Sequence, residues 1–105
     1  MSKNALDRLS ATIKERRNAP FEASYTRRLL GDPIKSAKKV GEEGVEVAIA
    51  ATAQDRAALI TETADLLYHL LVLLESRDVT LDEVCAELEQ RMGEPDEKRR
   101  KASSA

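Results

Sequence analysis

The sequence has little of several residue types on which other classes of protein depend. Among 105 residues it contains one cysteine, two tyrosines, one phenylalanine and no tryptophan. The single cysteine, Cys85, excludes an internal disulfide and fits a reducing cytoplasm. The net charge is -2, so no basic excess favours nucleic acid as a partner. We therefore expect a cytoplasmic protein that does not bind nucleic acid.

Long apolar runs and targeting segments are also missing from the pattern. We expect no window that is long and apolar enough to cross a membrane, and the polar start MSKNALDRLS lacks the form of a signal peptide. The length suits one compact domain, which we expect to cover residues 1–92. The segment GEPDEKRRKASSA at 93–105 has no large apolar side chain to bury and predicts a disordered tail.

Helical periodicity dominates what is present. We find no alternating apolar and polar run of the kind that predicts a strand, so the fold class is expected to be all-α. Asp32 followed by Pro33 is a typical helix start, and Thr80 with Glu83 has the spacing of a capping box. The predicted helices cover 5–17, a short turn at 25–30, 33–51, 55–76 and a last segment from Thr80 to about residue 92.

The apolar helix at 55–76 carries acids that its surroundings make unusual. At about 100° per residue, Glu62, Asp65 and His69 fall on one narrow strip, which Val72 continues. The strip could simply face water, but an unpaired charge among so many leucines would be costly to bury. We expect Leu70 and Leu74 to be deeply buried. They belong to a broad apolar face made of Leu59, Ile60, Ala64, Leu66, Leu67, Leu70, Leu71, Leu73 and Leu74.

The preceding long helix carries a second acidic pair. Glu43 and Glu46 lie three residues apart and so project from one face. They could be ordinary surface residues, because Lys38 with Glu42, and Lys39 with Glu43, have the spacing of surface ion pairs that contribute little. The apolar stripe of this helix is expected at Ile34, Ala37, Val40, Gly44, Val47, Ala48 and Ala51.

The two acidic pairs together favour a metal site. If the helices pack side by side, Glu43 and Glu46 on one would repel Glu62 and Asp65 on the other unless a cation lies among them. Clustered oxygen ligands suit a hard cation, and Mg²⁺ binds through carboxylates, water and substrate phosphates. No histidine and cysteine spacing offers a zinc site instead. The residues therefore predict a Mg²⁺ site between two helices.

Four segments resemble a known family. SYTRRLL, KKVGEEGVEVAIAA, ETADLLYHLLVLL and TLDEVCAELEQR are similar, in order and separation, to the phosphoribosyl-ATP pyrophosphatases. These belong to the MazG-like group of all-α nucleotide pyrophosphohydrolases. The resemblance covers roughly residues 5–92. It implies a MazG-like helical bundle completed by homodimerisation.

The resemblance also implies an activity. This is the Mg²⁺-dependent hydrolysis of phosphoribosyl-ATP to phosphoribosyl-AMP and pyrophosphate, the second step of histidine biosynthesis. The family's metal motif falls on Glu43, Glu46, Glu62 and Asp65. A carboxylate that is not fully committed to the metal could accept the proton of the attacking water. Glu42 and Glu43 are the candidates for that base.

Other residues could contact the substrate or support the ligands. Tyr25 could touch the base or the ribose. His69 could hydrogen-bond an acidic ligand, although a satisfied core histidine is the simpler interpretation. Cys85 is expected to be a core residue. The candidates for phosphate binding, each of which could equally be solvated surface, are Lys35, Lys38 and Lys39, with Arg27 and Arg28 as weaker ones.

Two other functions stay open. A general nucleoside-triphosphate pyrophosphatase that removes damaged nucleotides would use the same metal site with a different base pocket. A helical dimerisation module without activity would carry the same acids as surface residues. Turnover of phosphoribosyl-ATP and of ordinary nucleotides, with and without Mg²⁺, distinguishes the three.

Overall fold

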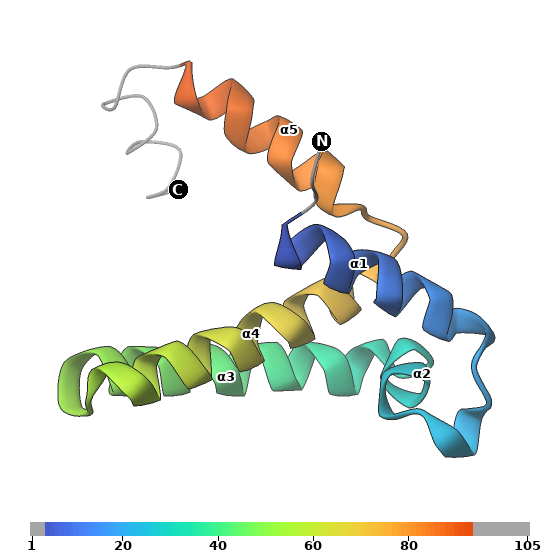
Figure 1. Ribbon diagram of the computed structural model, residues 1–105, viewed down its shortest axis with the longest axis horizontal. Coiled ribbons are helices and arrows are strands. Elements are labelled where there is room, and N and C mark those ends of the chain that lie inside the picture. Colours follow the sequence, from blue (N-terminus) through green and yellow to red (C-terminus); the bar gives the residue numbers. More distant parts are fainter. Residues whose placement is uncertain (1–3, 94–105) are drawn as a thin grey trace.

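The computed structural model describes residues 4–93, and its regular elements there are all helical (Figure 1). The predicted all-α fold is confirmed. The disorder expected at 93–105 falls, apart from Gly93, outside the described residues. The helices are α1 (Ala5–Glu15), α2 (Tyr25–Leu30), α3 (Pro33–Ala53), α4 (Arg56–Ser76) and α5 (Leu81–Met92), with 3-10 turns at Arg16–Asn18 and Phe21–Ala23.

The helices begin where capping side chains were predicted. Asp32 accepts from the backbone N–H of Lys35, and Pro33 fills the first position of α3. Thr80 and Glu83 form the expected capping box at the start of α5. Such caps satisfy backbone N–H groups that have no partner within the helix. Because a cap involves residues only three apart, the sequence alone was enough to predict it.

An antiparallel hairpin of α3 and α4 forms the body of the molecule (Figure 1). Gln54 and Asp55 make the turn between the two helices. α1 and α2 pack on α4, where a small core forms, and α5 projects away from the hairpin (Figure 1). That core consists of Ile13, Leu29, Leu71 and Val72.

Burial along α4 differs from the expectation. Val72 is fully buried, whereas Ile60, assigned to the apolar face, is 59% exposed. Leu70 and Leu74 are only half-buried in the single chain. The prediction of their deep burial is therefore wrong for the single chain. Periodicity shows where apolar side chains gather, but not whether the same chain supplies a neighbour to cover them.

The stripe predicted on α3 is also wrong in part. Ile34 is 85% exposed, whereas Ser36 and Ala50 are buried. Gly44 does not mark a close helix approach, because a methyl group added there would meet open space. The covered face contains Glu43, and it runs through Ser36, Val40, Glu43, Val47 and Ala50.

Two further expectations are contradicted. Cys85 is exposed on α5 rather than buried in the core. α4 is long and apolar enough, by length and composition, to cross a membrane, although no such window was expected. Core helices of soluble proteins share this composition. α4 also carries Glu62 and Asp65, which lipid would strongly disfavour.

Candidate active site

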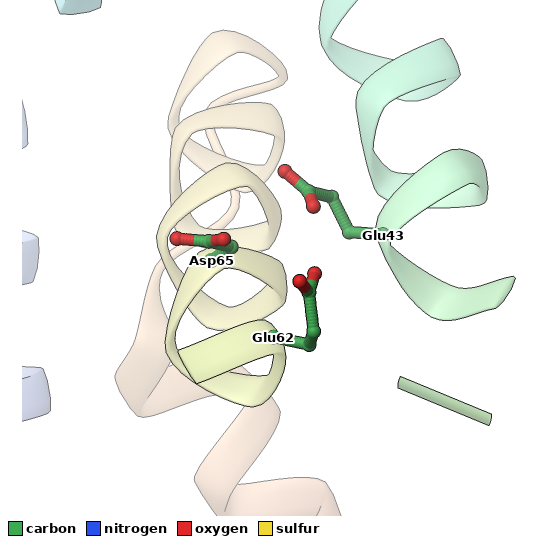
Figure 2. Close-up of side chains that lie close together, drawn as sticks. All are labelled: Glu43, Glu62 and Asp65. Atoms are coloured by element: carbon green, nitrogen blue, oxygen red, sulfur yellow. The ribbon is translucent and has the colours of Figure 1, made fainter. Parts of the chain in front are cut away.

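Carboxylates from α3 and α4 meet between the two helices. Figure 2 shows Glu43 reaching from α3 toward Glu62 and Asp65 on α4. One carboxylate oxygen from each residue lies within 4.8 Å of the other two. Glu43 and Glu62 are partly buried, and Asp65 is exposed. The structure thus brings together three of the four predicted ligands.

The fourth predicted ligand, Glu46, acts on this group through its charge. Glu46 is exposed on α3 and is not one of the three clustered acids. Partial desolvation raises the pKa of Glu62 above its ordinary value, and the charges of Glu46, Asp65 and Glu43 raise it further. The four acids therefore repel one another, and the set of oxygen donors fits a hard divalent cation.

His69 contacts the acid cluster from within the hairpin. Its Nδ1 lies 2.9 Å from Oε1 of Glu43 and 3.1 Å from the main-chain oxygen of Asp65. Its Nε2 lies 3.2 Å from the hydroxyl of Tyr25. His69 is 8% exposed. It is therefore both a buried, hydrogen-bonded histidine and a neighbour of a predicted ligand.

The predicted lysines lie along α3, near its N-terminus. Lys35, Lys38 and Lys39 line a cavity of about 470 Å³ together with Glu42. Oε1 of Glu42 lies 4.0 Å from Nζ of Lys39, and the Glu42 side chain is 54% exposed. Glu42 thus faces an open, lysine-lined space, whereas its neighbour Glu43 belongs to the acid cluster.

The arginines of α2 have partners within their own segment. Arg28 donates to the main-chain oxygens of Phe21 and Glu22, and the guanidinium of Arg27 lies 5.7 Å from the centre of the Phe21 ring. Both arginine side chains therefore contact the connector that precedes α2. Sequence reasoning also missed the contact of Tyr25 with His69, because no spacing signals a contact between residues 44 apart.

Comparisons with known proteins show which family the chain resembles. The family model described as phosphoribosyl-ATP pyrophosphohydrolase matches residues 6–92. A phosphoribosyl-ATP pyrophosphatase of Rhodobacter capsulatus is 54% identical over 90 residues, which cover 85% of this chain and 87% of that protein. A protein of the same name from Cereibacter sphaeroides is 54% identical over 86% of this chain and 88% of that protein. Another from a Caulobacter species is 53% identical over 84% of this chain and 82% of that protein. The resemblance seen in the four sequence segments is confirmed, and the chain belongs to the phosphoribosyl-ATP pyrophosphohydrolase family.

Proposed function

We propose that the protein hydrolyses phosphoribosyl-ATP to phosphoribosyl-AMP and pyrophosphate, the second step of histidine biosynthesis. The observation that carries this proposal is the cluster of Glu43, Glu62 and Asp65 between α3 and α4, in a chain of this family. The relatives are named for the same reaction. A polyphosphate substrate needs both a metal and protein cations, and the acid cluster and the lysine-lined cavity can provide them.

Glu43, Glu46, Glu62 and Asp65 would hold the metal, and Mg²⁺ fits a donor set made only of oxygens. Mg²⁺, when bound, neutralises the polyphosphate and stabilises charge on the leaving pyrophosphate. The carboxylates keep the reacting end of the substrate between α3 and α4. Three of these acids lie close together between the two helices, with Glu43 and Glu62 partly buried there.

The remaining roles follow from the two environments on α3. Lys35, Lys38 and Lys39 would bind phosphate oxygens, because they line one cavity. Glu42 opens into the same cavity and lies outside the acid cluster. Its carboxylate is therefore not committed to the metal site and can accept a proton from the attacking water. Glu43 is better suited to be a ligand, because its carboxylate lies among the other acids and contacts His69.

Glutamine variants of the two neighbouring glutamates should separate these roles. Glutamine keeps the size of glutamate but cannot take up a proton. We expect Glu42→Gln to lose about 100-fold or more in kcat and to stay impaired at high Mg²⁺. Glu43→Gln should instead recover much of its activity as Mg²⁺ is raised. Initial rates measured against Mg²⁺ concentration decide, and full recovery of both variants would leave neither glutamate as the base.

The proposed reaction is tested by measuring pyrophosphate release from phosphoribosyl-ATP with Mg²⁺ and after chelation. We expect release only with the metal. Ordinary nucleoside triphosphates serve as the comparison substrates, and their faster turnover would favour a general pyrophosphatase. Absence of turnover on every substrate would favour a dimerisation module.

We also propose a cytoplasmic homodimer with one domain over residues 1–92 and no membrane or nucleic-acid partner. Large apolar side chains are exposed on the hairpin and on α5, and patches of this kind are typical of interfaces. Two hairpins packed together would make a four-helix bundle and would cover α4, whose leucines one chain leaves half-exposed. The exposed residues are Ile34, Val45, Ile49, Ile60, Leu88 and Met92.

A further inference from the structure

We propose that Tyr25 and His69 form a relay of polar contacts that positions Glu43 within the acid cluster. Tyr25 would then act through His69, and not by touching the base or the ribose. The relay consists of the hydrogen bond between the Tyr25 hydroxyl and Nε2 of His69, and of the 2.9 Å contact between Nδ1 of His69 and Oε1 of Glu43. It joins α2, α4 and α3, in that order.

The contacts of Nδ1 fix the direction of the relay. Nδ1 of His69 faces the main-chain oxygen of Asp65 and the carboxylate of Glu43. A main-chain oxygen accepts hydrogen bonds and cannot donate them, and the same holds for an ionised carboxylate. Nδ1 must therefore carry a proton. In the neutral ring Nε2 is then the acceptor, and the Tyr25 hydroxyl donates to it.

Aromatic packing holds the ring of His69 in this orientation. Tyr68 lies edge-on to His69 with the ring centres 4.9 Å apart, and Tyr25 is edge-on at 6.1 Å. The rings of Tyr25 and Tyr68 are stacked at 6.5 Å. The Tyr68 hydroxyl is hydrogen-bonded to Thr26, so it does not compete for His69. These contacts restrict the imidazole to one orientation.

The relay gives Glu43 a donor where its other neighbours are acids. Glu62 and Asp65 repel the Glu43 carboxylate, and without a fixed donor that carboxylate could rotate away from them. The single Nδ1–H of His69 bonds to the main-chain oxygen of Asp65 and also faces one oxygen of Glu43, and it leaves the other oxygen of Glu43 for a cation. Groups of this kind orient ligands in metal sites.

Nitrogen NMR on the metal-free protein tests the direction of the relay. The chain has one histidine, so the imidazole ¹⁵N signals need no assignment. In the neutral ring we expect Nδ1 to carry the proton, which is the less common tautomer of free histidine. Tyr25→Phe should shift the Nε2 signal. The matched control, Tyr68→Phe, removes a hydroxyl that does not touch the ring nitrogens and should leave the signal in place. A proton on Nε2 in the neutral ring would overturn the proposal.

Amide variants of His69 test whether the Nδ1 donor matters, and this arm rests on the proposed metal site. The amide nitrogen of asparagine can replace Nδ1, whereas that of glutamine replaces Nε2. We expect calorimetry to show Mg²⁺ binding about 10-fold or more weaker in His69→Gln and clearly less weakened in His69→Asn. If His69 acted through packing alone, glutamine would be the better replacement, because it is closer to histidine in size. Mg²⁺ binding by His69→Gln that is as tight as or tighter than that by His69→Asn would overturn the proposal. If the parent protein binds no Mg²⁺, the proposed metal site fails while the tautomer result still decides the relay.

Discussion

Glu62→Gln is expected to lower turnover about 100-fold or more, while the metal-free protein stays as stable as the parent or becomes more stable. The loss follows because Glu62 is one of three acids whose oxygens lie within 4.8 Å of one another. Even substitutions of residues that only support metal ligands lower metal affinity or activity by about 10–100-fold. The gain in stability follows because Glu46, Asp65 and Glu43 repel its charge. Glutamine has the same shape and no charge.

This pair of opposite effects is expected of a charged group that serves the chemistry and not the fold. Substituting a residue that only maintains the fold would lower stability and activity together. Turnover of phosphoribosyl-ATP and thermal unfolding in the presence of chelator are the two measurements. Glu15→Gln on α1 removes an exposed acid by the same substitution and should change neither quantity. Near-normal turnover of Glu62→Gln at low Mg²⁺ would contradict the assignment of Glu62 as a ligand.

Ile60→Asp is expected to dissociate the proposed homodimer without unfolding the chain. Ile60 is 59% exposed on α4, so the isolated chain does not need it for packing. Burying an isoleucine side chain contributes about 1.5–3 kcal/mol, and a two-fold interface contains the residue twice. The dissociation constant should therefore rise by at least about 100-fold.

Sedimentation of the parent and the variant over a range of concentrations measures this shift, and circular dichroism confirms that the helices persist. Ala11→Asp places the same charge at an exposed position of α1 and should leave association unchanged. A parent protein that sediments as a fully active monomer at micromolar concentration would contradict the dimer itself. A dimeric Ile60→Asp would place the interface elsewhere.

Local interactions explain which parts of the fold could be predicted. Asp32 and Thr80 cap helices through neighbours three residues away, and the α3–α4 hairpin follows from two long periodic segments joined by a short turn. Three members of the acid cluster were predictable for the same reason, because spacing along a helix is local, whereas Glu46 is exposed and lies outside the cluster. Only the closeness of the two faces had to be assumed.

Contacts between distant segments explain what could not be predicted. The covered face of α3 runs through Ser36 and Ala50 rather than Ile34, since composition does not show which side of a helix meets its neighbour. Cys85 has apolar neighbours in sequence but none in space that cover it. The pairing of Tyr25 with His69 depends on how α2 is placed on α4, which no periodicity encodes.

The two-residue turn between α3 and α4 has a consequence for how fast the chain folds. Glu43 and Asp65 are separated by a short stretch of chain, and contacts between residues close in sequence form quickly because little loop entropy is lost. The charges that face each other across the hairpin oppose its closure. In the metal-free chain, dissolved monovalent salt screens such repulsion. Added salt should therefore speed refolding, so the acids gathered for chemistry also set the pace at which their own scaffold assembles.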